Sequence, residues 1–162
     1  MKGAGVLTKA EEVVSRLMEK GWRITFAESC TGGMAAAELV AVADASKVFD
    51  GSFVTYANEA KVKYLGVDPQ MISEIGVVSE AVALEMAKGA ASQMHSQVAV
   101  GISGIAGPTG AVPGKPIGTV CFGFVIDNEQ FAVTKHFGDM GRNAVRKVST
   151  DFVYDTLLDK LA

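Results

Sequence analysis

One stretch, Ala27-Glu28-Ser29-Cys30-Thr31-Gly32-Gly33, indicates the fold of the chain most clearly. This stretch continues the short apolar run Ile24-Thr25-Phe26-Ala27 and precedes a helix-like segment from Met34 to Val42. Apolar and β-branched residues, followed by Gly-Gly and an Ala-rich segment, predict a strand, a tight polar turn and a helix. The turn places a serine beside the unpaired N–H groups of a helix start, which suits either a nucleophile or a bound anion.

Helices and strands alternate on both sides of this turn. Apolar periodicity and capping residues predict helices from Thr8 to Lys20 with Gly21 as the stop, from Glu59 to Leu65 with Asn58 as N-cap, from Pro69 to Ile75, from Glu80 to Met94 with Ser79 as N-cap, and from Asn143 to Leu161. Strand-forming runs cover 49–56, 98–102, 117–126 and 131–137, and a Gly/Pro loop covers 103–116. The short link 127–130 joins the last two strands as an antiparallel hairpin.

This alternation predicts a three-layer α/β/α fold. The sheet should be mixed and mostly parallel, with helices on both faces and the antiparallel hairpin at its C-terminal end. No internal repeat, low-complexity tract or linker interrupts the sequence, so we expect a single domain over residues 1–162. Ligands of such sheets bind beyond the carboxyl ends of the strands, where the turns at 28–33, 57–59 and 103–110 would gather.

Composition and charge argue against several classes of protein. The 162 residues carry a formal net charge of -3 and show no basic patch, which disfavours nucleic-acid binding. Residues 1–5 do not resemble a signal peptide, and no apolar run approaches the roughly 20 residues of a membrane span. Cys30 and Cys121 have no partner at metal-ligand spacing, and His95 and His136 are isolated. We therefore expect a cytoplasmic protein that uses no metal and no cofactor.

Ser29 and the residues after it can be interpreted in two ways. Ser29 could cap the following helix, or it could be a nucleophile beside backbone N–H donors. Cys30 is a stronger intrinsic nucleophile, but lone cysteines are more often small buried apolar residues, and we rank Cys30 as structural. Thr31, Gly32 and Gly33 offer backbone N–H groups that could hold an oxyanion or a phosphate.

Lys61 is the second residue that suggests chemistry. In the first turn of its predicted helix, the dipole disfavours a cation by ~0.3–1 kcal/mol, and burial would lower the lysine pKa further, toward a neutral amine that accepts a proton. The alternative is a solvated surface lysine beside Lys63. Tyr56, at the end of a predicted strand, is either core packing or a proton relay next to Lys61. Arg142 and Arg146 lie one helical turn apart and could clamp a phosphate, although such pairs are usually solvated.

Several long motifs, taken in order, resemble one known family. They are Thr25-Phe26-Ala27-Glu28-Ser29-Cys30-Thr31-Gly32-Gly33, Val54-Thr55-Tyr56-Ala57-Asn58-Glu59-Ala60-Lys61, Leu65-Gly66-Val67, Gly76-Val77-Val78-Ser79-Glu80, Ser103-Gly104-Ile105-Ala106-Gly107-Pro108 and Lys115-Pro116-Ile117-Gly118-Thr119-Val120. Over about Leu7 to Leu161 the chain is similar to the CinA C-terminal-domain family, the nicotinamide mononucleotide amidases.

The resemblance implies hydrolysis of the carboxamide of nicotinamide mononucleotide to nicotinate mononucleotide and ammonia, a step of pyridine nucleotide salvage. Ser29 matches the family serine that attacks the amide carbon, Lys61 the lysine that takes the serine proton, and Tyr56 a tyrosine that supports this transfer. Backbone N–H groups of either 31–33 or 104–107 would hold the oxyanion. The implied partners are a small nucleotide substrate and further copies of the chain, in a homodimer or higher homo-oligomer. Expected substrate-binding residues are Thr31, Gly32, Gly33, Ser103, Gly104, Gly107 and Arg142.

Two departures from the family pattern keep other functions open. The family usually has an acidic residue just before its Lys-Pro-Val-Gly-Thr-Val motif, where this chain has Gly114. Its usual Gly-Asp-Arg is stretched here to Gly138-Asp139-Met140-Gly141-Arg142. One alternative is therefore a nucleotide-binding or assembly module that keeps the fold without turnover. Another is an amidase that uses Cys30 as its nucleophile.

Overall fold

The computed structural model describes residues 5–162, and its centre is one five-stranded sheet in the order β2-β1-β3-β4-β5. The strands are β1 (Ile24–Glu28), β2 (Phe53–Val54), β3 (Val98–Gly104), β4 (Thr119–Ile126) and β5 (Glu129–His136). The pairs β1·β2 and β1·β3 are parallel, whereas β3·β4 and β4·β5 are antiparallel. The predicted mixed sheet with a C-terminal antiparallel hairpin is confirmed. Its parallel share is smaller than expected, because β4 also runs antiparallel to β3.

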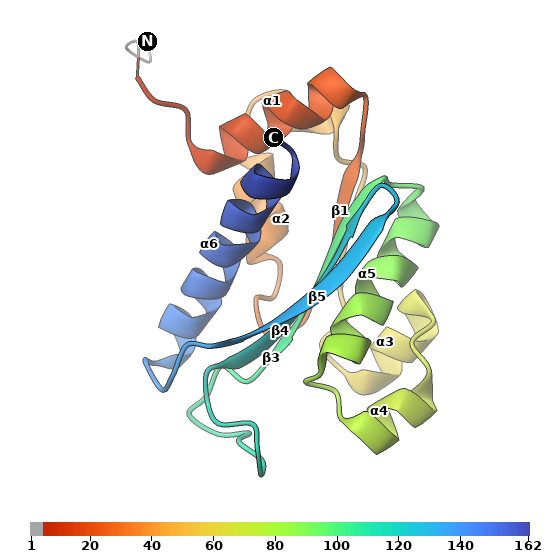
Figure 1. The fold of residues 1–162 in the computed structure, drawn as a ribbon, viewed down its shortest axis with the longest axis vertical. Helices are drawn as coiled ribbons and strands as arrows, with labels where there is room; N and C mark the ends of the chain where they lie inside the picture. The colour runs from red at the N-terminus through yellow and green to blue at the C-terminus, as the bar shows by residue number, and fades with distance from the viewer. Residues whose placement is uncertain (1–4) are drawn as a thin grey trace.

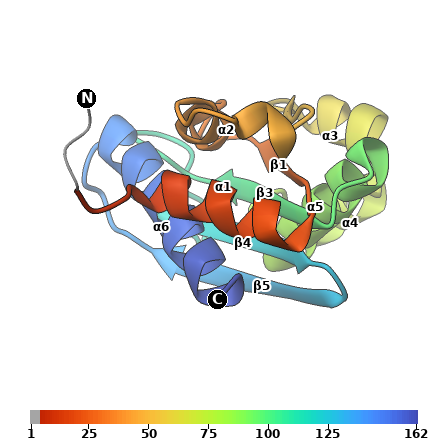
Figure 2. The same cartoon turned by 90° about the horizontal axis from the view of Figure 1, so that it is seen from above.

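Helices cover both faces of this sheet, as the three-layer prediction requires (Figure 1). On one face lie α1 (Lys9–Lys20), α2 (Met34–Val40) and α6 (Arg142–Lys160), and Figure 2 shows α1 and α6 side by side. On the other face lie α3 (Asn58–Leu65), α4 (Pro69–Ile75) and α5 (Glu80–Met94). A short 3₁₀ helix, η1 (Ala45–Lys47), follows α2. The largest core cluster packs α1, α2 and α6 against the sheet through Phe26, Phe122, Leu17, Leu39 and Leu157.

The predicted capping residues of two helices are confirmed. The Thr8 hydroxyl accepts a hydrogen bond from the Glu11 N–H at 3.1 Å, and Ser79 accepts one from the Val82 N–H at 3.2 Å. Gly21 ends α1 in the left-handed conformation, with φ at 68°. The ends of a helix depend on a few neighbouring residues, so these caps could be predicted from the sequence alone.

Helix α5 packs unusually close to the sheet, and two glycines permit it. A Cβ atom at Gly101 of β3 would overlap the Ala83 carbonyl oxygen, and one at Gly123 of β4 would overlap the backbone of Leu84. Side chains at these positions would push α5 off the sheet. The close contact fixes α5 and its N-terminal loop relative to the carboxyl end of β3, where the Ser103-Gly104 segment lies.

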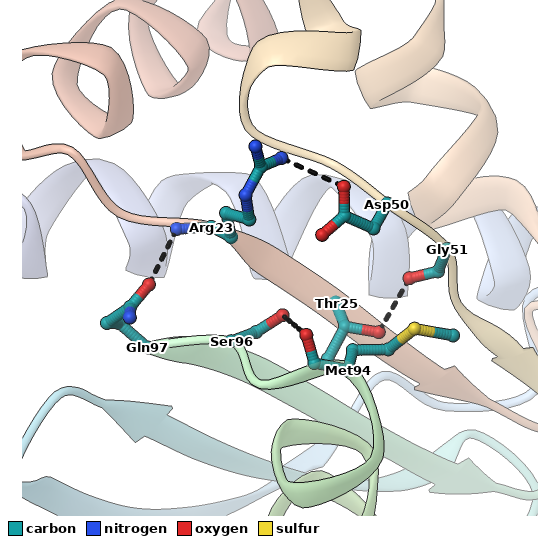
Figure 3. A network of polar contacts seen from close by, with 7 residues as sticks. All are labelled: Arg23, Thr25, Asp50, Gly51, Met94, Ser96 and Gln97. Carbon is teal, nitrogen blue, oxygen red and sulfur yellow. Dashed lines mark hydrogen bonds and ion pairs between the residues drawn. The ribbon is translucent and has the colours of Figure 1, made fainter.

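The strand predicted over 49–56 is reduced to Phe53 and Val54, and Figure 3 shows why. The carbonyl of Gly51 accepts a hydrogen bond from the Thr25 hydroxyl at 2.8 Å, and Asp50 pairs with the Arg23 guanidinium at 2.9 Å. Side chains at the amino end of β1 therefore hold this segment, instead of a continuous strand ladder. Asp and Gly are also poor strand formers.

Other predicted boundaries shift by a few residues. Helix α3 begins at Asn58 itself, with Ala57 as N-cap, so the predicted capping role of Asn58 is wrong. After β2 the backbone is still extended at Ala57, with φ −78° and ψ 151°. Ala57 is therefore the N-cap of α3, and it makes no side-chain hydrogen bond to the helix. Ser103 and Gly104 end β3 and do not belong to the following loop. The hairpin turn contracts to 127–128, because Asp127 adopts a positive φ of 53°.

The sequence predicts neither a membrane span nor a signal peptide, and the two predictions concern different residues. None of the helices in residues 5–162 combines the length and apolarity that crossing a membrane requires. The prediction about a signal peptide concerns residues 1–5, of which 1–4 lie outside the described residues.

Candidate active site

The turns after β1, β2 and β3 meet at one pocket of about 320 Å³. Parallel strands β2, β1 and β3 point their carboxyl ends the same way, so the segments that follow them share one edge of the sheet. The predicted gathering of these turns is thus observed. The pocket is lined by Ser29, Cys30, Tyr56, Asn58, Lys61, Val77, Val78, Ser103, Gly104, Ile105, Ala106, Gly107, Thr109, Gly110 and Arg142.

Ser29 and Lys61 form a hydrogen-bonded pair in this pocket. The Lys61 Nζ atom lies 3.3 Å from Ser29 Oγ. Lys61 is only 1% exposed, so the interpretation as a solvated surface lysine is wrong. Burial lowers the pKa of Lys61 from 10.5 to about 8, against a small opposing effect of Cys30. At pH 7 about a tenth of this amine is therefore unprotonated and can accept a proton.

Two backbone carbonyls complete the surroundings of the Lys61 amine. Nζ donates to the carbonyl oxygens of Thr55 at 2.6 Å and Tyr56 at 3.1 Å. A neutral amine has two N–H bonds and one lone pair. If both N–H groups bind the carbonyls, the lone pair remains for the hydroxyl proton of Ser29. In its neutral form, the lysine can therefore accept a proton from the serine in this geometry.

Glu28 holds the turn that carries Ser29, a role that sequence reasoning missed. Its carboxylate is fully buried and accepts hydrogen bonds from Thr31 Oγ1 at 2.7 Å and from the N–H groups of Ala35 at 2.9 Å and Ala36 at 3.1 Å. The last two N–H groups belong to the first turn of α2, where a negative charge is favourable. The sequence did contain a signal for this role: a Glu stands directly before the serine and a few residues before the start of a helix.

Tyr56 and Arg142 pair at the rim of the pocket. The Arg142 guanidinium donates to the Tyr56 hydroxyl at 3.1 Å and to the Gly107 carbonyl at 2.9 Å. The backbone of Tyr56, and not its hydroxyl, is what binds Lys61. Arg146 has other partners: it donates to the Cys30 and Thr31 carbonyls at 2.9 and 3.2 Å. The two arginines thus bind different groups.

The remaining predicted residues divide between the pocket lining and its support. Ser103, Gly104 and Gly107 line the pocket, and the buried Ser103 hydroxyl donates to the Val77 carbonyl at 2.7 Å. Thr31, Gly32 and Gly33 lie outside the lining, and the Gly32 N–H donates to the Ser29 carbonyl at 3.1 Å within the turn.

Two other chemistries can be compared with this arrangement. Cys30 is 6% exposed, and burial raises the pKa of its thiol to about 11, so the thiolate is scarce near neutral pH. In the described residues, no three His, Cys, Asp or Glu side chains come together in a way that could hold a metal ion.

Comparison with known proteins places this fold and site in a family. The sequence model of the CinA C-terminal domain matches residues 7–161. The chain belongs to this family. A CinA-like protein of Syntrophobacter fumaroxidans is 47% identical over 138 residues, which are 85% of this chain and 32% of that protein. One of Petrotoga mobilis is 46% identical over 144 residues, 88% of this chain and 35% of that protein. The chain thus spans about a third of the length of these curated relatives.

Solved structures of the CinA superfamily share the whole fold. The Klebsiella pneumoniae 700603 protein superposes with a TM-score of 0.90 at 36% identity, covering 94% of this chain and 95% of that one. The Agrobacterium tumefaciens competence/damage-inducible protein CihA gives a TM-score of 0.88 at 33% identity, over 99% and 100% of the two chains. The architecture around the pocket is therefore that of the CinA superfamily.

Proposed function

We propose that this chain is an amidase that hydrolyses the carboxamide of nicotinamide mononucleotide to nicotinate mononucleotide and ammonia. The observation that carries the proposal is the buried pair of Ser29 and Lys61, 3.3 Å apart, with the lysine pKa lowered to about 8. A serine with an adjacent base is the arrangement that nucleophilic acyl transfer needs. The sequence resemblance to the nicotinamide mononucleotide amidases supplies the substrate.

In the first half of the reaction, Ser29 Oγ attacks the carboxamide carbon while its proton passes to Lys61 Nζ. The carbonyl electron pair moves to oxygen and forms a tetrahedral oxyanion. When the carbonyl re-forms, the C–N bond breaks, and the Lys61 ammonium gives its proton to the nitrogen that leaves as ammonia. The nicotinoyl group remains on Ser29 as an ester. The 3.3 Å distance would shorten in the substrate complex, as catalytic hydrogen bonds commonly do.

In the second half, water replaces the serine. Lys61 takes a proton from the water, whose oxygen attacks the ester carbon, and the proton then passes to the departing Ser29 oxygen.

The backbone N–H groups that could hold the oxyanion differ in whether they already have a partner. The N–H groups of Gly32 and Ile105 donate to the carbonyls of Ser29 and Thr119. Ala106 and Gly107 line the pocket, and their N–H groups form no hydrogen bond within residues 5–162. These two are the better candidates.

The substrate phosphate would be bound by Arg142. This residue lies in the first turn of α6, where backbone N–H groups and the helix dipole also favour an anion. The stretched segment before it does not remove it from the pocket, since its guanidinium reaches Gly107. Binding of a phosphate here would compete with the Tyr56 hydroxyl for the guanidinium, which gives Tyr56 a part in substrate entry.

The test is ammonia release from nicotinamide mononucleotide, its dinucleotide and free nicotinamide, measured side by side. The proposal expects turnover of the mononucleotide by the wild type and loss of at least about 1,000-fold in Ser29→Ala, because the nucleophile is gone. An undiminished rate in Ser29→Ala would exclude the mechanism. Tight mononucleotide binding by calorimetry, with no product at high protein concentration, would favour the non-catalytic binding module instead.

A further inference from the structure

Arg146 makes an unusual set of contacts for a helix residue close to a pocket. Its Nε donates to the Cys30 carbonyl at 2.9 Å, its Nη2 to the Thr31 carbonyl at 3.2 Å, and its Nη1 to the Asn143 side-chain oxygen at 3.0 Å. It does not belong to the lining of the pocket. The guanidinium therefore binds the backbone of residues 29–33, which we call the serine turn.

These contacts fix two successive peptide units of the serine turn. A trans peptide unit is planar and its C=O and N–H point in opposite directions. Holding the Cys30 and Thr31 carbonyls therefore also sets the directions of the N–H groups of Thr31 and Gly32. The Gly32 N–H closes the turn on the Ser29 carbonyl at 3.1 Å. Arg146 is thus linked to Ser29 through one short run of backbone.

Gly32 is shaped for this contact. Its φ is +58°, and a Cβ atom added to it would lie 3.3 Å from Arg146 Nη2. The guanidinium thus lies directly against the backbone on one side of the turn. The buried Glu28 carboxylate binds Thr31, Ala35 and Ala36 and so restrains the same segment independently. The turn is held from two elements, β1 and α6.

A second contact of α6 provides a natural comparison. The buried Tyr154 hydroxyl donates to the Ala35 carbonyl in α2 at 2.6 Å. It also ties α6 to the segment after β1, but it binds α2 and not the serine turn. Loss of the Tyr154 bond would loosen the docking of α6, whereas loss of the Arg146 bonds would remove the restraint that α6 places on the turn itself.

We propose that Arg146 is a positioning residue that keeps the Ser29 hydroxyl aligned with Lys61 by holding the peptide units on its C-terminal side. Its planar fork binds two carbonyls at once, which a lysine ammonium does less well. As a role in turnover, this inference rests on the proposed amidase function. As a statement about the turn, it holds for any function of Ser29.

The experiment compares wild type, Arg146→Met, Arg146→Lys and Tyr154→Phe in the full chain. Methionine keeps an apolar stem on α6 but removes all donors. For Arg146→Met we expect kcat for ammonia release to fall about 10- to 100-fold with KM within about twofold of wild type, because a displaced nucleophile slows chemistry without weakening binding. Arg146→Lys should recover part of this loss. Tyr154→Phe should lose stability but keep kcat within about twofold.

Amide hydrogen exchange supplies a readout that does not need turnover. Exchange of the Gly32 amide should quicken about tenfold or more in Arg146→Met and stay near wild type in Tyr154→Phe. Unchanged exchange in Arg146→Met overturns the inference, as does an unchanged kcat, a rise in KM alone, or an equal loss of kcat in Tyr154→Phe. If the wild type releases no ammonia, the proposed function fails, and the exchange comparison still decides whether Arg146 holds the turn.

Discussion

The pH dependence of catalysis is the sharpest prediction, because it depends on the environment of a single amine. Only unprotonated Lys61 can accept the Ser29 proton, so kcat/KM should follow the neutral fraction of that amine. With the pKa lowered from 10.5 to about 8, the neutral fraction at pH 7 is about 10%, compared with about 0.03% for an ordinary lysine. Burial thus provides a factor of about 300 in the amount of active base.

The sign follows from the cause of the shift. Burial disfavours the ammonium, so the proton leaves at lower pH than in water, and the base form accumulates as pH rises through about 8. Between pH 6.5 and 7.5, kcat/KM should rise about eightfold. It should level off above about pH 9, where the amine is almost fully neutral.

The assay is initial-rate ammonia release between pH 6.5 and 10, a range above the second ionisation of the substrate phosphate. Lys61→Arg is the matched variant, because arginine keeps the positive charge and length but does not release its proton. It should lose at least about 1,000-fold in kcat/KM. A profile flat from pH 6.5 to 9, a midpoint near 10.5, or substantial activity in Lys61→Arg would refute the role of Lys61 as base.

Three further substitutions test other parts of the site. Glu28→Gln should lower the free energy of unfolding, measured in urea, by about 1–3 kcal/mol. The two carboxylate oxygens of Glu28 each accept a hydrogen bond from an N–H group of α2, and the NH₂ group of glutamine cannot accept one. Unchanged stability would contradict this prediction. Thr55→Val should raise the unfolding free energy by up to about 1 kcal/mol, since the buried Thr55 hydroxyl has no hydrogen-bond partner in the described residues; a destabilised variant would show a partner instead. Cys30→Ala should keep kcat within about tenfold of wild type, because its thiol is protonated near neutral pH; loss comparable to Ser29→Ala would reassign the nucleophile.

Sequence reasoning succeeded where a few neighbouring residues determine the outcome. Thr8 and Ser79 cap their helices as predicted, since a cap requires only one side chain and N–H groups three residues on. The meeting of Ser29 and Lys61 was also within reach, because adjacent parallel strands bring the segments that follow them to one edge of the sheet. A family resemblance sharpened that expectation without replacing it.

Other features required the chain's path in three dimensions. Arg142 and Arg146 look equivalent in sequence and lie one helical turn apart. Arg142 nevertheless reaches the pocket, whereas Arg146 binds carbonyls of the serine turn. No local pattern separates two arginines four residues apart on one helix. The 49–52 segment was misassigned for a similar reason, because its hydrogen bonds go to side chains at the start of β1.

The distribution of charged groups around Ser29 fits the role of base that we propose for Lys61. A carboxylate beside Lys61 would hold it protonated, and none contributes to its pKa. Glu28 lies next to Ser29 in sequence, yet its carboxylate is bound by Thr31 and by two N–H groups of α2. Lys61 is left with two neutral carbonyls, which can accept from the amine in either protonation state. Desolvation then outweighs the opposing effect of the Cys30 charge, and the amine reaches a pKa at which it can both take a proton from a serine and return it to a leaving group.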